Sequence, residues 1–183
     1  GVALESGYVR TDERLATSTP GVYAIGDLVF GLQLAHRGFA QGIFLAEDIA
    51  FRAGRLDRAP APVLDRDIPR VIYSDPEIAS VGLTEPQAKE TYGEIETYEY
   101  NLGGNGKSQI LQTAGLVKLV REKNGPIVGV HMVGPWVTEQ LGQGYLAVNW
   151  EATVDEVAEF IQPHPSLSEL FGESVLALTG RSL

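Results

Sequence analysis

The residues best suited to chemistry lie near the C-terminal end of the chain, in the run His164-Pro165-Ser166-Leu167-Ser168-Glu169. Histidine is the side chain whose ordinary pKa lies closest to neutrality, so it is the usual choice for moving a proton at pH 7. A carboxylate further along this run can accept the N–H of one ring nitrogen, which fixes the tautomer and stabilises the imidazolium that forms. The spacing therefore predicts a general base, His164, oriented by Glu169.

A structural interpretation of the same run stays open. Ser166 and Glu169 have the spacing of a capping box, in which a glutamate side chain reaches back to a backbone N–H at the start of a helix. His164 would then be an ordinary residue of a proline-flanked loop, and the residues alone favour neither interpretation. His131 is a weaker candidate, because it lies in an apolar, strand-like run where a hydrogen-bonded core histidine is the commoner outcome.

The groups on which such a dyad would act are not in this sequence. The chain has no cysteine, which excludes disulfides and thiolate metal sites, and it has no nucleophile elbow. Its only methionine is Met132, and it opens with Gly1, which favours a piece of a longer protein. We therefore expect the dyad to serve chemistry housed elsewhere.

Composition excludes several classes of partner. The 183 residues are 44% hydrophobic and 21% charged, as in a soluble globular protein of one domain, or one domain and part of another. With 24 acidic against 14 basic residues, the net charge of −10 argues against binding nucleic acid or an anionic membrane. No apolar run approaches the roughly 18–20 residues that span a bilayer. No signal peptide is visible, and the lack of cysteine fits a cytoplasmic protein.

The chain divides at a proline-rich connector. Residues 1–52 contain an apolar run, 22–25, that predicts a buried strand, and a helical pattern over 36–51. In that pattern Phe39, Ile43, Ala46 and Ala50 share one face. Residues 53–67 are expected to form a protease-sensitive linker, and residues 68–183 a second unit.

The second unit shows strands first and helices afterwards. Strands are expected at 71–73, 78–81, 95–101, 115–121 and 127–133, with a hairpin turn at 123–126. Helices are expected after a capping box at Thr84, over 136–150, over 153–160 after a second box at Thr153, and over 167–179. This order predicts an α+β fold, a mainly antiparallel sheet packed against helices, preceded by a partial α/β segment.

Two further candidates lie in the first unit. Asp27 would follow the strand at 22–25, and a carboxylate at such a strand end often accepts hydrogen bonds from ribose-like hydroxyls. Leu34, Ala35 and His36 open the predicted helix, whose unpaired N–H groups suit a cofactor atom that becomes anionic. Taken alone, these residues favour purely structural interpretations, in which Gly-Asp is a turn, Leu34 belongs to the core and His36 has no function.

Four motifs together resemble the flavoprotein pyridine nucleotide-disulfide oxidoreductases, and among them the dihydrolipoamide dehydrogenases. The motifs lie at residues 19–27, 34–37, 76–85 and 164–169. Their order and spacing cover nearly the whole chain. The resemblance implies that residues 1–52 are the C-terminal part of an FAD-binding domain, that 53–67 are a linker, and that 68–183 are the interface domain.

The resemblance also implies roles for the candidate residues. Asp27 would bind the ribityl hydroxyls of FAD, and the backbone at Leu34, Ala35 and His36 would lie near the flavin pyrimidine edge. His164, held by Glu169, would act in the partner subunit's active site, which makes a homodimer obligatory. The implied substrates are NAD and a lipoyl-bearing subunit of a 2-oxo-acid dehydrogenase complex.

Departures from the family pattern limit what this chain does by itself. The family's redox-active cysteine pair, its FAD pyrophosphate turn and the NAD fingerprint G-x-G-x-x-G are missing, and the glycine cluster 103–106 has the wrong spacing. Ser166 also stands where threonine is more typical. We therefore expect the isolated chain to be inactive and nearly colourless. The alternatives are a glutathione reductase-like enzyme and a non-catalytic dimerisation module.

Overall fold

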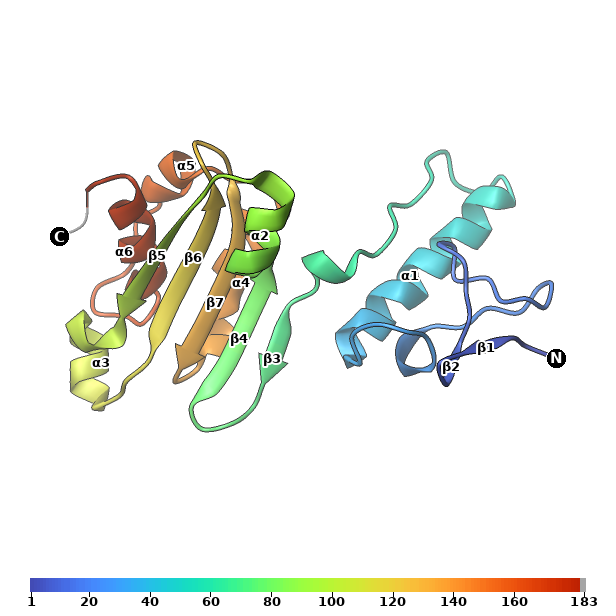
Figure 1. Cartoon of the computed structure of the whole chain (residues 1–183), viewed down its shortest axis with the longest axis horizontal. Helices are drawn as coiled ribbons and strands as arrows, with labels where there is room; N and C mark the ends of the chain where they lie inside the picture. Colours follow the sequence, from blue (N-terminus) through green and yellow to red (C-terminus); the bar gives the residue numbers. More distant parts are fainter. Residues whose placement is uncertain (182–183) are drawn as a thin grey trace. The chain divides into compact units, whose positions relative to one another are not determined.

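The computed structural model describes residues 1–181, and Figure 1 follows them from the N-terminus in blue to the C-terminus in red. The chain forms two compact units that divide after Asp65. The first unit contains the short strands β1 (Leu4–Glu5) and β2 (Tyr8–Val9), the 3-10 turn η1 (Gly26–Leu28) and the long helix α1 (Ala35–Arg52). A second 3-10 turn, η2 (Asp65–Asp67), follows in the connecting segment.

The buried strand expected at 22–25 is wrong. This segment makes one isolated bridge, between Ala16 and Tyr23, and the Val22 side chain is exposed. A strand needs a partner along its whole length to satisfy its backbone groups. Among the described residues this segment has such a partner only in the short stretch around Ala16, so its apolar composition alone does not make it a strand.

Helix α1 forms where the spacing predicts it, but it buries its other face. Phe39 and Ile43 are 72% and 62% exposed, whereas Arg37, Gln41, Phe44 and Asp48 are buried. The buried polar groups are satisfied by specific partners: Gln41 accepts the N–H of Gly26 at 2.7 Å, and Asp48 forms ion pairs with Arg14 and Arg52. Hydrogen bonding of this kind offsets the cost of burying polar atoms.

The second unit is built on a five-stranded sheet of order β3-β4-β7-β6-β5, in which every neighbouring pair is antiparallel. Its strands are β3 (Arg70–Ile72), β4 (Glu77–Gly82), β5 (Ile95–Asn101), β6 (Leu116–Glu122) and β7 (Ile127–Gly134). Its helices are α2 (Glu85–Tyr92), α3 (Gly106–Leu111), α4 (Val137–Asn149), α5 (Val154–Ala158) and α6 (Glu169–Leu178), with a 3-10 turn η3 (Leu102–Gly104) before α3. The predicted α+β fold with an antiparallel sheet is confirmed.

Helices cover both faces of this sheet (Figure 1). Alternate residues of β6 and β7, including Val117, Leu119 and Met132, face the main core with α4 and α6. Between Val117 and Leu119, Lys118 faces the opposite side, where it pairs with Glu85 of α2 at 2.7 Å. Both predicted capping boxes are present at the starts of α2 and α5.

Helix α4 approaches β7 closely through a glycine. A Cβ atom added at Gly144 would lie 2.8 Å from a methyl carbon of Val130, whereas a Cβ added at Gly142, on the exposed side, would meet nothing within 4 Å. The two glycines lie two positions apart on one helix. Each carries the same cost of low helix propensity, so the positions differ only in how the helix packs there.

These glycines make a matched pair for a stability test. Gly144→Ala should destabilise the chain by about 1–3 kcal/mol, because the added methyl overpacks the core against Val130. Gly142→Ala should stabilise it by about 0.5–1 kcal/mol, because alanine has the better helix propensity. Urea unfolding at neutral pH measures both, and equal effects at the two positions would contradict this packing.

His131 is the hydrogen-bonded, partly buried histidine that its apolar strand predicts. Its Nε2–H donates to the carbonyl of Leu83 at 3.0 Å. Burial lowers the pKa of His131 below its ordinary value, and the positive charges of Arg70 and Lys118 act in the same direction, against the bond to Leu83.

This lowered pKa gives stability a pH dependence. Because the folded chain disfavours protonated His131, the unfolded chain binds more protons as the pH falls through the ordinary value of 6.5, and stability is lost. His131→Gln removes this titration. Urea unfolding at pH 7.5 and 5.5 should therefore show a larger loss for the wild-type chain than for the variant, and equal losses would rule out this role.

Candidate functional site

The predicted dyad lies in the non-helical segment between α5 and α6. Pro163 and Pro165 flank His164, and proline cannot continue a helix, so the chain stays open here before α6 begins at Glu169. Leu167 and Leu170 are buried in the main core and anchor the end of the segment. The imidazole is thus carried on a loop whose C-terminal end is fixed.

The structure places His164 and Glu169 in contact. His164 Nδ1 lies 2.7 Å from Glu169 Oε1, and the second oxygen, Oε2, accepts the N–H of Ser166 at 2.7 Å. The orienting role and a capping box are the alternatives that the sequence leaves open. The carboxylate makes the orienting contact and also reaches back to the Ser166 N–H, but no capping box forms, because the N-cap residue of α6 is Ser168 and the Ser166 hydroxyl has no hydrogen-bond partner among the described residues. The His164 side chain is 76% exposed and that of Glu169 is 20% exposed.

This contact decides which nitrogen of His164 is available. An ionised carboxylate only accepts hydrogen bonds, so the proton of neutral His164 sits on Nδ1 and the lone pair on Nε2. The exposed ring is open to a reacting group. The dyad can therefore accept a proton at Nε2 and stabilise the resulting charge through Glu169.

Asn105 supports the loop, and the sequence interpretation missed it. Its Nδ2 donates to the carbonyl of Ser166 at 3.0 Å, while its Oδ1 accepts the N–H of Ser108 and so caps α3. The run 103–106 was interpreted only as a glycine cluster. An asparagine before a helical turn is a capping signal, and it would have located α3.

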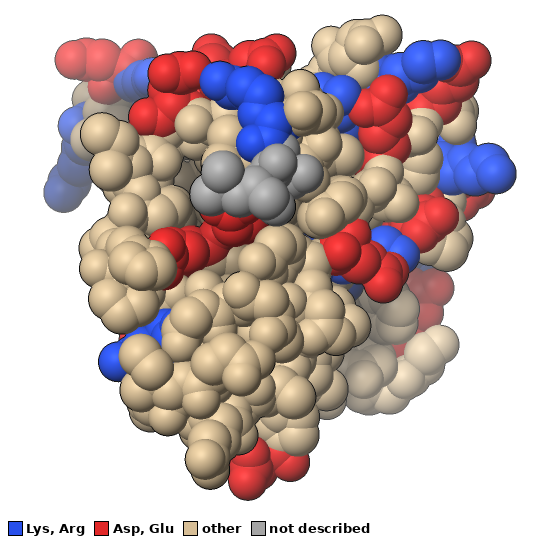
Figure 2. Space-filling model, turned by 90° about the vertical axis from the view of Figure 1, so that its left-hand side faces the viewer, with Lys and Arg blue, Asp and Glu red and all other residues tan. Residues whose placement is uncertain are grey.

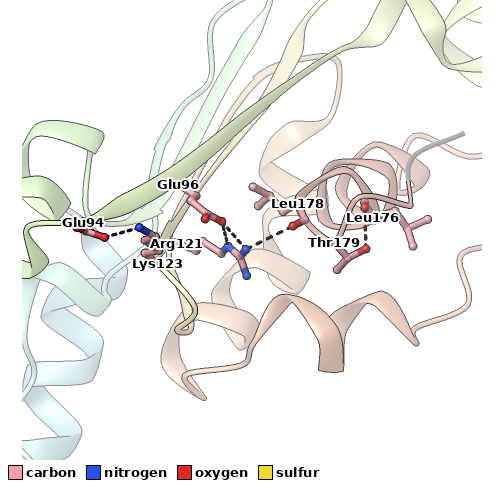
Figure 3. A network of polar contacts seen from close by, with 7 residues as sticks. All are labelled: Glu94, Glu96, Arg121, Lys123, Leu176, Leu178 and Thr179. Atoms are coloured by element: carbon pink, nitrogen blue, oxygen red, sulfur yellow. Dashed lines mark hydrogen bonds and ion pairs between the residues drawn. The ribbon is translucent and has the colours of Figure 1, made fainter.

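The far end of α6 is tied to the sheet. Figure 3 shows Arg121 of β6 between Glu96 of β5 and the last turn of α6. Arg121 Nε donates to Glu96 Oε2 at 2.8 Å, and its Nη2 donates to the carbonyl of Leu178 at 3.4 Å. Glu169, at the first turn of α6, therefore stands on a helix that is held at both ends.

One area of the surface at this end of the second unit carries no charged side chains. Figure 2 looks at the left-hand end of Figure 1, where α3 and α6 lie, and it shows a broad area without acidic or basic residues, bordered by charges. Phe160 and Ile161, shortly before His164, are exposed. Exposed large apolar side chains and an uncharged surface area are each typical of protein–protein contacts.

The candidate cofactor-binding residues of the first unit lie in the turn η1 and at the start of α1, which pack against each other. Asp27 lies exposed in η1 rather than at a strand end, which corrects the expectation. The turn crosses the first turn of α1 closely, since a Cβ added at Gly38 would lie 3.4 Å from the Cα of Gly26. Buried Arg37 donates to the carbonyl of Phe30 at 2.8 Å and pairs with Asp65 at 2.7 Å, which fixes the loop.

The first turn of α1 is open to a ligand. Leu34 is the N-cap residue and offers no side-chain cap, Ala35 is exposed, and His36 is half-buried. Helix N-termini carry N–H donors and partial positive charge, and Asp27 adds an exposed acceptor. These groups fit a molecule with hydroxyls and an edge that becomes anionic, as a flavin has.

Residues 1–181 contain neither a membrane-spanning helix nor a cluster of metal-ligating side chains. No helix there is long and apolar enough to cross a membrane. No group of three or more His, Asp or Glu side chains in this part of the chain could hold a metal ion.

The Ser166 hydroxyl gives a test of the loop. It is buried without a hydrogen-bond partner among the described residues, whereas the buried Ser108 hydroxyl donates to the carbonyl of Thr113 at 2.8 Å. Ser166→Ala should leave stability within about 0.5 kcal/mol of the wild type or raise it, and Ser108→Ala should cost about 1 kcal/mol. Urea unfolding of both variants measures this, and the reverse order would contradict the geometry.

Comparison with known families matches both units. Residues 68–175 match the family described as pyridine nucleotide-disulphide oxidoreductase, dimerisation domain, and residues 1–42 match the pyridine nucleotide-disulphide oxidoreductase family.

Individual relatives agree with this match. The chain is 39% identical over 182 residues to a dihydrolipoyl dehydrogenase of Bacillus subtilis, covering 98% of the chain and 38% of that protein. It is 34% identical to a leghemoglobin reductase of Glycine max, covering 93% and 32%. The crystal structure of LpdA from Mycobacterium tuberculosis superposes with a TM-score of 0.85 at 27% identity, over 97% of this chain and 38% of that one. The chain thus spans between about a third and two fifths of the length of these relatives.

Proposed function

This chain belongs to the pyridine nucleotide-disulphide oxidoreductase family, and on that premise we propose that it supplies the acid–base dyad of a dihydrolipoamide dehydrogenase. The whole enzyme would oxidise the dithiol of a lipoyl group and reduce NAD. FAD, when bound, would carry the electron pair between the sulfur atoms and NAD. The redox-active thiols must come from outside these 183 residues, which contain no cysteine.

The contact between His164 Nδ1 and Glu169 Oε1 carries this proposal. A thiolate is the nucleophile in thiol–disulfide exchange, and a free thiol of pKa about 8.5 is only a few per cent ionised at pH 7. His164 would take the thiol proton at Nε2 at the moment of attack, and Glu169 would hold the ring and stabilise its charge. General-base assistance of this kind is worth about 10²–10⁴ in rate.

Residues of the first unit would hold part of the flavin. We assign Asp27 to its hydroxyl groups, and the backbone at Leu34, Ala35 and His36 to the edge of the ring. In this assignment residues 1–52 belong to an FAD-binding domain, 53–67 form a linker, and 68–183 form the interface domain.

A homodimer is the assembly that suits the exposed dyad. The uncharged area of Figure 2 and the exposed residues Phe160 and Ile161 favour a protein surface as its partner. His164 would then act in the active site of the second subunit. The lipoyl-bearing subunit of a 2-oxo-acid dehydrogenase complex would deliver the substrate, in the cytoplasm.

A chimera tests the proposed function. This chain would replace the matched C-terminal part of the Bacillus subtilis dihydrolipoyl dehydrogenase, and the product would be assayed for flavin absorbance and dihydrolipoamide-dependent NAD reduction. His164→Gln should lower turnover about 10²–10⁴-fold while flavin stays bound, because only proton transfer is lost. Gly142→Ala, exposed on α4, is the control and should keep both.

Other outcomes would identify the alternatives. Undiminished turnover in His164→Gln would remove the dyad from the mechanism. Reduction of glutathione disulfide without lipoamide turnover would indicate a glutathione reductase-like enzyme. A chimera that dimerises and binds flavin but turns over neither substrate would indicate a non-catalytic dimerisation module.

A further inference from the structure

We propose that Asn105 is the positioning residue of the dyad, and that it acts by holding the peptide chain at Ser166. The inference rests on the proposed role of His164 as base, and it adds a residue from α3 that lies about sixty positions earlier in the sequence.

The Asn105 side chain is buried, and both ends of its amide have hydrogen-bond partners. It is 4% exposed, its Nδ2 donates to the carbonyl of Ser166 at 3.0 Å, and its Oδ1 accepts the N–H of Ser108 at 2.9 Å. A carbonyl oxygen only accepts and a backbone N–H only donates, so the amide has one orientation that satisfies both partners. The same side chain therefore caps α3 and holds the loop.

Ser166 links this amide to the dyad. Its carbonyl accepts from Asn105, and its N–H donates to Glu169 Oε2 at 2.7 Å. The other oxygen of Glu169 faces His164 Nδ1 at 2.7 Å. The polar contacts form an unbroken series from Asn105 through Ser166 and Glu169 to His164. If the Ser166 carbonyl is released, the N–H that aligns the carboxylate loses its fixed place.

The start of α3 also lies close to the imidazole. A Cβ atom added at Gly106, the first residue of α3, would lie 3.9 Å from Cε1 of His164. The ring therefore lies beside the residue that follows Asn105. Within this segment, buried Ser108 donates from its hydroxyl to the carbonyl of Thr113, just after α3 ends. The loop of His164 therefore lies against an ordered helical turn.

The chemistry of the contact requires an amide. An ionised aspartate at position 105 would keep an oxygen for the N–H of Ser108, although its charge would be buried there. It would also turn a second oxygen toward the carbonyl of Ser166, and two acceptors repel each other. Asn105→Asp therefore separates the positioning role from the capping role. Asn101→Asp is the matched control, since Asn101 is exposed and caps η3 by accepting the N–H of Gly103 at 2.7 Å.

Nuclear magnetic resonance of this chain tests the first step. Long-range ¹H–¹⁵N correlation distinguishes the imidazole tautomers, and His36→Gln, His131→Gln and His164→Gln assign the three histidines. In the wild type and in Asn101→Asp, neutral His164 should carry its proton on Nδ1. In Asn105→Asp that preference should be lost, because the carboxylate of Glu169 is no longer held in place. An unchanged tautomer would overturn the inference.

The chimera with the Bacillus subtilis enzyme tests the consequence. Asn105→Asp should lower kcat about 10–100-fold, the effect of a modest misplacement of a reacting group, with the KM for NAD unchanged. Asn101→Asp should match the wild type. Should Asn105→Asp fail to fold, Asn105→Ser carries the test, because serine keeps a capping oxygen and lacks the donor.

The two proposals fail in different ways. If His164→Gln turns over normally, the proposed function is wrong whatever the tautomer shows. If His164→Gln is inactive while Asn105→Asp and Asn105→Ser keep both wild-type turnover and the Nδ1–H tautomer, only the role of Asn105 is wrong.

Discussion

The candidate site depends on the carboxylate of Glu169, because its two oxygens bond two different partners. One bonds the imidazole of His164 and the other bonds the backbone of Ser166. A side chain that bonds the backbone loses rotational freedom, so the oxygen that faces the histidine is fixed as well. Glu169 is the first residue of α6, so the residue at which the loop ends is also the residue that orients the His164 base.

In the first unit, polar side chains are buried together with apolar ones such as Phe44. Arg37, Gln41 and Asp48 project from the buried side of α1 to backbone groups and ion-pair partners of the surrounding loops. Hydrogen bonds and ion pairs are directional. They therefore restrict the position of the Gly26 turn on α1 more tightly than apolar packing would. A loop that presents a carboxylate such as Asp27 needs this kind of placement.

How much of this was predictable depends on whether the determining contact is local. The strand at 95–101 follows from alternation, and the strand at 127–133 follows from its apolar run and the turn between β6 and β7. The capping boxes at Thr84 and Thr153 are complete within four residues. The failed strand at 22–25 and the inverted face of α1 depend on distant partners, which periodicity does not reveal. Asn105 belongs to the same class, since its contact with Ser166 joins segments far apart in the sequence.

The exposed apolar side chains of α1 affect the solubility of the chain. Phe39 and Ile43 stand on a surface whose dispersal in water relies on the chain's excess negative charge of −10. As acidification approaches the isoelectric point near 4.7, that repulsion vanishes while these side chains keep their attraction for another copy. In a preparation of these 183 residues alone, mild acid or concentrated salt therefore favours association of folded molecules through this helix.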